Sequence, residues 1–371
     1  MNYLCTYMLI VFFILIAGVV AVYLFMQNPS FGASPAGEDR VRISKSANFR
    51  NGQFQNLHAT PTFSEDSGYA KVFKKIFFEK HPRRRPDSPL PSIKTDLQNL
   101  DPGKNMLVWF GHSSYFIQLN RKTILVDPVF SGNASPLRFT TRSFAGSDIY
   151  QADDLPRIDY LFLTHDHWDH LDHKTVLKLK PKVQKIITGL GVGAHFRHWG
   201  FEPFRISELD WNQEITLDPG FVVYSQSARH FSGRGFKRNR TLWSSFILQA
   251  ADKKIFFGGD SGYDRHFTEI GERFGPFDLA ILEDGQYDQN WKFIHMTPEE
   301  TVQAAMDLKA KMLLPVHWAK FSLSVHAWDE PIIRIKKEAY LKNLNLIHPR
   351  IGEAVDLDNP AIFESWWEGM T

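Results

Sequence analysis

The chain has 371 residues, of which 43% are hydrophobic and 23% charged, and its 43 Lys and Arg residues nearly balance its 41 Asp and Glu residues. This globular composition excludes a disordered chain, a collagen-like fibre and a polytopic membrane bundle. A formal net charge of +2 argues against a dedicated nucleic-acid binder, which would carry a clustered basic excess. The single cysteine, Cys5, permits neither an intramolecular disulfide nor a thiolate metal site in the body of the chain, so any metal would be held by His, Asp or Glu.

An uncharged, apolar run from Leu4 to Met26 comes first along the chain. As a helix it would reach about 34 Å, enough to cross a hydrocarbon core of about 30 Å. We therefore expect residues 1–26 to form a transmembrane anchor. A cleaved signal peptide is the alternative, but the run is too long and no basic residue precedes it. Basic residues follow the run at Arg40 and Arg42, so the positive-inside rule favours a cytoplasmic location for the rest of the chain.

Residues 27–48 are rich in Ser, Gly, Ala and Pro and are expected to form a linker. Residues 49–371 then form one domain, because no repeat and no internal linker divides them. Within this domain, the segment 71–85 carries seven Lys and Arg residues against one Glu, with apolar residues at helical spacing. It is either a basic amphipathic helix that lies on anionic lipid or a short helix that packs on the domain and exposes a basic edge.

Short apolar stretches open the domain, and strands that alternate with helices follow. We expect strands at 106–110, 115–119, 122–126, 158–163, 185–188, 221–225, 245–249, 254–257, 279–282 and 312–315. We expect helices at 175–180, 267–274 and 299–308. Antiparallel strands followed by alternating strands and helices predict sheets with helices on their outer faces.

A run of potential metal ligands follows the strand 158–163 directly: His165, His167, Asp169 and His170. Alternation along an extended segment points the first two side chains the same way, and the other two follow as the chain turns. Four ligands within six residues cannot all bind one tetrahedral ion with good geometry, but they suit two neighbouring ions. Imidazole and carboxylate are the ligands expected for zinc or a similar metal. A solvated His-rich loop is the alternative, but so many polar groups beside an apolar strand require partners.

Three isolated residues stand in the same context, because each follows an apolar strand: His230, Asp260 and His317. Taken singly, each has a structural explanation as a hydrogen-bonded buried histidine, a turn residue or a helix cap. Two ions need more ligands than the first motif supplies, so together with that motif these residues become ligand candidates.

The motif His165-x-His167-x-Asp169-His170, followed by His230, Asp260 and His317, resembles the metal-ligand order of the metallo-β-lactamase superfamily. Further segments are similar to the N-acyl-phosphatidylethanolamine-hydrolysing phospholipases D, namely 108–113, 127–131, 134–136, 259–263, 274–280 and 295–300. The likeness covers about residues 47–355. It implies a fold of the α+β class, a four-layer αβ/βα sandwich, which here is preceded by one N-terminal transmembrane helix.

Carried over residue by residue, the resemblance implies two zinc ions. The first would be held by His165, His167 and His230, the second by Asp169, His170 and His317, and Asp260 would bridge them as a catalytic residue. The resemblance further implies that a hydroxide between the ions attacks the phosphodiester of a phospholipid. Two cations lower the pKa of bound water, so no Ser or Cys nucleophile is needed.

Five more residues are candidates for supporting roles. His295 either acts as a catalytic residue that contacts the substrate or only leads into the helix 299–308. Asp127 is positioned to orient a ligating histidine, and His112 is either similar or simply a turn residue, which is the interpretation we favour. Tyr263 and Tyr287 are candidate substrate contacts.

Glu283 and Asp284 depart from the phospholipase pattern, because two acids near the metals would disfavour a phosphate group. Two alternatives therefore stay open beside the lipid phosphodiesterase: a di-metal hydrolase of a soluble ester, lactone or phosphodiester, and a non-catalytic membrane or envelope protein of the same fold. Membrane lipid is the expected partner. Self-association as a homodimer stays open, because no sequence feature specifies it.

Overall fold

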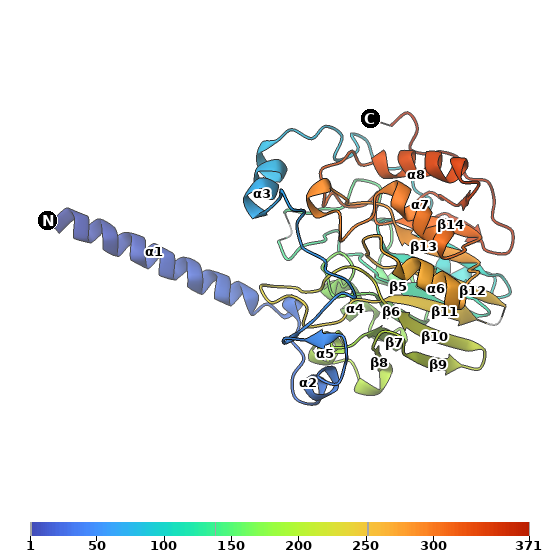
Figure 1. Ribbon diagram of the computed structural model, residues 1–371, viewed down its shortest axis with the longest axis horizontal. Helices are drawn as coiled ribbons and strands as arrows, with labels where there is room; N and C mark the ends of the chain where they lie inside the picture. Colours follow the sequence, from blue (N-terminus) through green and yellow to red (C-terminus); the bar gives the residue numbers. More distant parts are fainter. Residues whose placement is uncertain (1, 138, 251, 371) are drawn as a thin grey trace.

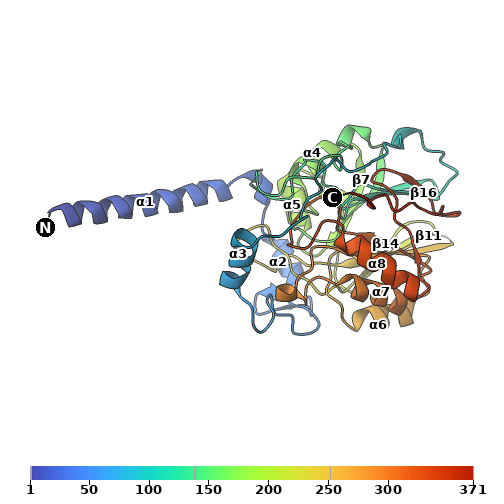
Figure 2. The same cartoon turned by 90° about the horizontal axis from the view of Figure 1, so that it is seen from above.

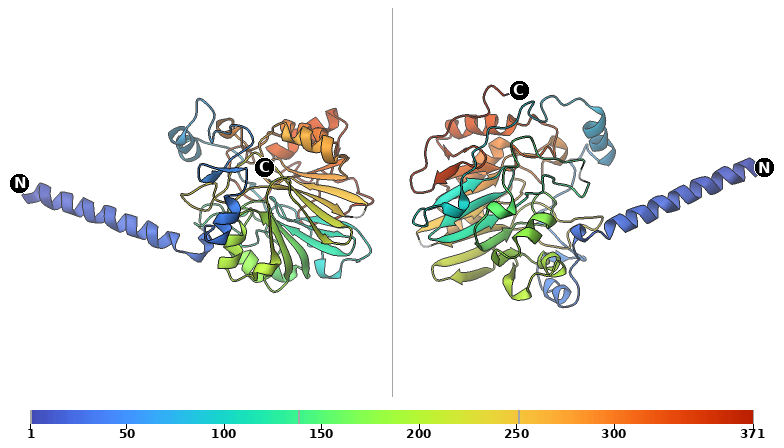
Figure 3. Two further views of the ribbon diagram at one scale, coloured as in Figure 1. Left: turned by 60° about the horizontal axis from the view of Figure 1, so that its bottom comes forward. Right: turned by 180° about the vertical axis from the view of Figure 1, so that it is seen from behind.

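Two β-sheets pack face to face in the computed structural model, which describes residues 2–137, 139–250 and 252–370. Helices cover both outer faces of the pair, and Figure 3 shows the two sheets from partly below and from behind. This arrangement is the predicted four-layer αβ/βα sandwich. The helix α1 (Asn2–Met26) projects from one end of it (Figure 1, Figure 2). It is exposed, long and apolar enough to cross a membrane.

The first sheet joins an antiparallel half to a parallel half. In spatial order its strands are β16 (Ala354–Asp356), β3 (Met106–Trp109), β4 (Tyr115–Leu119), β5 (Lys122–Val126), β6 (Ile158–Leu163), β7 (Val183–Gly189) and β8 (Ile206–Leu209). Pairing is antiparallel from β16 to β5 and parallel from β5 to β8. Parallel neighbours need crossover connections, and the helices α4 (His173–Leu179) and α5 (Gly193–His198) lie in two of them.

The second sheet repeats this plan. In spatial order its strands are β15 (Asn345–Leu346), β14 (Met312–Val316), β13 (Leu279–Glu283), β12 (Lys253–Phe257), β11 (Ser245–Ala250), β10 (Phe221–Gln226) and β9 (Glu214–Asp218). Pairing is antiparallel from β9 to β12 and parallel from β12 to β15. The crossover helices are α6 (His266–Phe274), α7 (Pro298–Asp307) and α8 (Glu330–Leu341).

Strand β6 shows how the layers are held together. Phe162 points into the space between the sheets, where its ring lies 5.5 Å from that of Phe246 and 5.1 Å from that of Phe257. Its neighbours Leu161 and Leu163 belong to the apolar cluster on the other face, under the helices α4 and α5. This alternation matches the two-residue period of a strand, and burial on both faces explains why β6 is apolar throughout its second half.

Segment 27–48, which the sequence analysis predicts to be a linker, packs on the domain. It contains the helix α2 (Glu38–Ile43), and the side chain of Ile43 is buried with Trp211 and Trp243. The Trp199 indole donates a hydrogen bond to the carbonyl of Pro29 at 2.8 Å. A small hairpin, β1 (Phe49–Arg50) with β2 (Gln53–Phe54), continues from this segment.

The basic segment 71–85 begins in the helix α3 (Tyr69–Phe78), which lies on the side of the domain from which α1 projects (Figure 1, Figure 2). The elements expected from the sequence do not include α2, β1, β2, β8, β9, α5, α8, β15 and β16. Strand β9 is an edge strand of mixed polarity, so its sequence pattern is weak. Helix α5 begins with a glycine and has only six residues, so its helical periodicity is weak.

We expect Phe162→Ala to lower the free energy of unfolding by about 3–5 kcal/mol, because it leaves a cavity where the two sheets meet. Chemical denaturation measures this change. Phe204→Ala is the matched control: that ring is exposed, and its loss should change stability by less than about 0.5 kcal/mol. Equal effects of the two substitutions would contradict the assignment of the core.

Candidate metal centre

The carboxyl ends of four strands meet at one edge of the paired sheets. The loop after β6 carries His165, His167, Asp169 and His170, and the segments after β10, β12 and β14 carry His230, Asp260 and His317. The structure brings all seven predicted ligands together. Their ligand atoms form two neighbouring clusters within which every atom lies less than 4.8 Å from the others.

The first cluster contains His165, His167, His230 and Asp260. The Nδ1 atom of His167 lies 2.9 Å from Nε2 of His165 and 3.3 Å from Nε2 of His230. Asp260 Oδ2 lies 3.7 Å from each of those two Nε2 atoms. Three imidazole nitrogens and one carboxylate oxygen therefore converge on one point.

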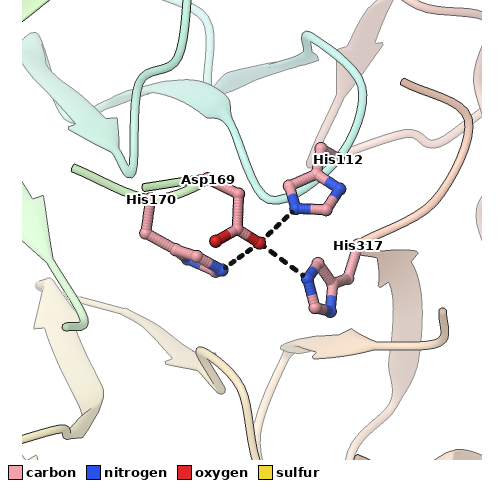
Figure 4. Close-up of side chains that lie close together, drawn as sticks. All are labelled: His112, Asp169, His170 and His317. Atoms are coloured by element: carbon pink, nitrogen blue, oxygen red, sulfur yellow. Dashed lines mark hydrogen bonds and ion pairs between the residues drawn. The ribbon is translucent and has the colours of Figure 1, made fainter. Parts of the chain in front are cut away.

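The second cluster contains His112, Asp169, His170 and His317, and Figure 4 shows three rings around one carboxylate. Asp169 Oδ2 lies 2.9 Å from Nε2 of His112, 3.2 Å from Nε2 of His317 and 3.5 Å from Nε2 of His170. His112 was interpreted from the sequence chiefly as a turn residue. It does lie in the turn between β3 and β4, but its ring also reaches into the centre.

Asp260 stands between the two clusters. Its Oδ2 belongs to the first cluster and also lies 3.2 Å from Nε2 of His170, while its Oδ1 lies 3.4 Å from Nδ1 of His317. Gly259 makes this position accessible: it has φ of +61°, and a Cβ there would stand 2.8 Å from Cβ of Thr164. Only a glycine lets the end of β12 approach the end of β6 so closely.

Most ligand rings are fixed through the nitrogen that faces away from the centre. The partners of these nitrogens are Thr164 Oγ1 for His165 (3.0 Å), Asp127 Oδ2 for His170 (2.8 Å), the Ile294 carbonyl for His230 (2.9 Å) and Glu283 Oε2 for His317 (3.1 Å). Such partners orient metal-binding histidines and select the tautomer. Asp127 thus lies where the sequence analysis expects it.

The acids flagged as departures from the phospholipase pattern have separate surroundings. Glu283 is buried between His317 and His295, and its Oε2 lies within hydrogen-bond distance of Nδ1 of both rings. Burial raises the pKa of Asp284 well above its usual range, and neither of its carboxylate oxygens has a hydrogen-bond partner in the described part of the chain. This shift favours the neutral form of Asp284, which lowers the negative charge beside the centre.

The donor set fits a divalent metal of the zinc type. His170 Nε2 and Asp260 Oδ1 are buried without an aligned hydrogen-bond partner among the described residues, although polar atoms face them at 3.2–3.4 Å. Buried polar atoms that face one another without a hydrogen bond destabilise the fold, unless a ligand such as a metal ion binds between them. Imidazole nitrogens with carboxylate oxygens are the ligands that zinc accepts.

The charges of the two clusters differ. Burial lowers the pKa of His165 and of His230 well below the usual value. Burial also opposes protonation of His170, but nearby carboxylates, Asp260 first, raise its pKa well above the usual value. The same balance raises the pKa of His317 to about 10. In the metal-free protein, these shifts therefore favour neutral imidazoles in the first cluster and protonated His170 and His317 in the second.

A buried hydrogen-bond network lies under the metal-binding loop and was not predicted from the sequence. Asp166 accepts hydrogen bonds from Nε2 of His195 (3.1 Å) and the Thr241 hydroxyl (2.8 Å). The buried Arg234 donates to the carbonyls of Asp166 (2.9 Å) and Ser30 (2.8 Å), and its guanidinium lies 3.9 Å from the centre of the Trp168 ring. One feature of the sequence points to this network. Side chains alternate along the motif, so Asp166 points away from the face that His165 and His167 share.

Two adjoining cavities open on the centre. A pocket of about 240 Å³ is lined by predicted ligands of both clusters and by His295, whose ring lies 5.0 Å from that of His230. A larger groove of about 820 Å³ also reaches His167 and Asp169. Its other residues are mostly apolar.

The two tyrosines predicted to contact substrate lie elsewhere. The Tyr263 hydroxyl donates to Asp307 at 2.6 Å, on α7, and the Tyr287 hydroxyl donates to Glu330 at 2.7 Å, on α8. Neither residue lines the pocket at the metal-binding clusters. Their hydroxyls are held by carboxylates on the helices that cover the second sheet.

Residues 122–318 match the family model described as the β-lactamase superfamily domain. An uncharacterized protein of Mycobacterium tuberculosis is 36% identical over 95% of this chain and 96% of its own length. N-acyl-phosphatidylethanolamine-hydrolyzing phospholipase D 1 of Caenorhabditis elegans is 28% identical over 78% of this chain and 87% of its own length. Among solved structures, a metallo hydrolase of Ignicoccus hospitalis superposes with a TM-score of 0.52 at 20% identity, covering 68% of this chain and 97% of that one.

This chain therefore belongs to the β-lactamase superfamily and has the metallo-β-lactamase fold. It is a metal-dependent hydrolase of that superfamily. The family match covers both sheets' central strands and includes all seven predicted ligands.

We expect zinc binding to the metal-free protein to release protons and to strengthen as the pH rises through neutrality. The pKa of His317 is raised to about 10 and that of His170 is raised too, which favours their protonated forms, but a ligand imidazole must be neutral. Isothermal titration in two buffers of different ionisation enthalpy measures the released protons. Binding heats that do not depend on the buffer, or an affinity that rises on acidification, would contradict this charge assignment.

Proposed function

We propose that this protein is a membrane-anchored di-zinc hydrolase that cleaves the phosphodiester of an N-acyl phosphatidylethanolamine-like phospholipid, as a phospholipase D does. In this proposal α1 is the anchor, and each of the two clusters holds one ion with Asp260 shared between them. Zinc ions bound there would activate water as the nucleophile and neutralise the charge that grows on a phosphoryl oxygen.

The groove of about 820 Å³ is the observation that carries the proposal. Its lining includes Val22, Phe25 and Met26 from the last turns of α1, together with the predicted ligands His167 and Asp169. An acyl chain that leaves a bilayer beside α1 would remain in contact with apolar side chains until its headgroup reaches the centre. A soluble ester or lactone would need no such groove.

Arg238 supports a substrate that carries a negative charge. This exposed residue lines both the groove and the pocket, so it stands where the two cavities join. Its guanidinium lies 4.7 Å from the centre of the Phe231 ring, which in turn packs against the ring of His167 at 4.4 Å. A guanidinium offers paired donors that match a phosphate, and here it is held by stacking on an aromatic ring.

His295 and Glu283 support a proton-transfer role beside the centre. Glu283 Oε2 lies against Nδ1 of His295, which favours the tautomer with the hydrogen on Nδ1. The other ring nitrogen, Nε2, then accepts or returns a proton at the pocket. Ser261 and Met296 donate their backbone N–H groups to Glu283 Oε1 and hold this carboxylate in place.

The name of the Caenorhabditis elegans relative supports the same substrate class, because that protein aligns along most of both chains. The two acids that argued against a phosphate substrate also fit this proposal. Burial raises the pKa of Asp284 and so favours its neutral form, and the Glu283 carboxylate faces two histidines, which reduces the negative charge that either acid presents to a phosphate.

We expect the zinc-loaded, detergent-solubilised protein to convert N-acyl phosphatidylethanolamine to phosphatidic acid, detected by mass spectrometry. Asp260→Asn should lower this activity by about 100- to 1000-fold, the scale seen when one charge-stabilising group is removed. Asp252→Asn, a change at an exposed aspartate, is the matched control and should leave the activity unchanged. A protein shown to carry two zinc ions that yields no phosphatidic acid would rule out the phospholipase and leave the metal-dependent hydrolase.

A second measurement tests the groove. Phe236 lines it and is 83% exposed, so Phe236→Glu should not impair folding. We expect this variant to lower kcat/KM for a long-chain lipid by about 10-fold or more, since a buried Phe side chain contributes roughly 1.5–3 kcal/mol. A short-chain, water-soluble analogue should be cleaved as before.

Phe204→Glu serves as the control, because Phe204 is similarly exposed and lies outside the groove. If both glutamate variants act alike, or if the Phe236 variant impairs the short-chain analogue equally, the groove does not bind the acyl chain.

A further inference from the structure

Helix α3 exposes an apolar and basic surface on the side of the domain from which α1 projects (Figure 1, Figure 2). Tyr69 is 71% exposed and Phe78 is 75% exposed, and Phe73 is more than half exposed. A soluble surface rarely gathers three large aromatic side chains on one short helix, and such a patch marks a contact with a protein or a membrane.

Other contacts attach α3 to the domain. Val72 and Ile76 are half-buried, and the Lys75 ammonium pairs with Asp288 at 2.6 Å. Tyr69 packs its ring against that of Phe63 at 4.8 Å, and Phe63 lines the pocket at the metal-binding clusters. The helix is therefore a fixed part of the rim of the candidate active site.

The basic residues of the segment 71–85 divide into two groups. Arg83 pairs with Asp329, and Arg85 donates to the Ser143 carbonyl at 3.1 Å, so the end of the segment binds to the domain. Lys71, Lys74 and Lys80 are exposed and form no ion pair within the described ranges of the chain. Two of these lysines lie on α3, and Lys80 follows its end.

The groove reaches this side of the molecule as well. It is lined by the last turns of α1 and by the exposed side chains of Leu137 and Phe236. A bilayer crossed by α1 would face this side, and the charge of α3 is opposite to that of anionic phospholipids. Aromatic side chains that reach the acyl boundary and lysines that reach headgroups are the features of a helix that lies in the interface.

We infer that α3 is a second membrane contact, which lies in the headgroup layer of a bilayer that contains anionic phospholipid. This inference rests on the proposed anchoring by α1 and adds a contact that depends on lipid charge. With two contacts instead of one, the domain cannot rotate about α1, and the mouth of the groove stays against the lipid surface. Anionic lipid in the bilayer therefore determines how the candidate active site faces its substrate.

The test uses the full chain in nanodiscs of phosphatidylcholine alone or of an equimolar mixture with phosphatidylglycerol. An environment-sensitive fluorophore (NBD) is attached to Cys5 of the native chain, or to Phe73→Cys or Tyr340→Cys after Cys5→Ser. We expect Cys5 on α1 to give blue-shifted emission in both nanodiscs. The label at position 73 should shift only in the anionic nanodiscs, and high salt should remove this shift, because salt screens exposed charges.

The label at position 340 is the control for the domain surface, since Tyr340 is exposed on α8, away from the end of the domain that carries α1 (Figure 1, Figure 2). It should not shift in either nanodisc. Lys71→Glu, Lys74→Glu and Lys80→Glu together should abolish the shift at position 73, whereas Lys309→Glu, Lys337→Glu and Lys342→Glu, at exposed sites, should preserve it.

A shifted label at Cys5 with no shift at position 73 in anionic nanodiscs would overturn the inference and leave the anchor intact. It would instead favour a protein partner for the exposed face of α3. An unshifted label at Cys5 would contradict the anchoring by α1 itself. A shift at position 73 that persists in neutral nanodiscs and survives the three α3 charge reversals would show that lipid charge has no part in the contact.

Discussion

The burial of many ionisable side chains at one point is the constraint on which this structure depends. Histidines and carboxylates that would be hydrated in an unfolded chain lie within 4 Å of one another with almost no access to water. Such a cluster costs free energy unless its members pair or bind a cation. The surrounding residues meet part of this cost: Asp127, Thr164 and Glu283 each hold a ligand ring from behind.

Both sheets contribute residues to the centre. The first sheet and its loops contribute His112, Asp127 and the motif from His165 to His170, and the second contributes His230, Asp260 and His317. Neither half has a complete cluster, since Asp260 must reach across to His165 and His170. The packing of the two sheets around Phe162 therefore also positions the ligands, and a change that separates the sheets also separates the ligands.

The predictable parts of this protein are those encoded by neighbouring residues. The motif after β6 could be interpreted as a metal site because its ligands are contiguous, and the paired-sheet fold followed from strand order and family resemblance. The sequence does not show that carboxylates on distant helices hold the hydroxyls of Tyr263 and Tyr287. Glu283 appeared unfavourable because the sequence does not show that two histidines face it. The linker was predicted from small residues, whereas its packing depends on partners more than 150 residues away, such as Glu208.

The contact between Arg234 and Ser30 connects the segment that follows α1 to the metal-binding loop. Arg234 is buried, and its donors connect the Ser30 carbonyl, just after α1, to the carbonyls of Asp166 and Leu171 in the metal-binding loop. A soluble form cut after Met26 keeps this cation satisfied. A form cut at residue 48 removes the Ser30 acceptor of Arg234 and the Pro29 acceptor of the Trp199 indole. It thereby leaves the buried Arg234 cation less well paired beside the metal-binding loop. Residues 27–48 are thus the first structural element of the enzyme, and any shortened version that is to bind metal normally must include them.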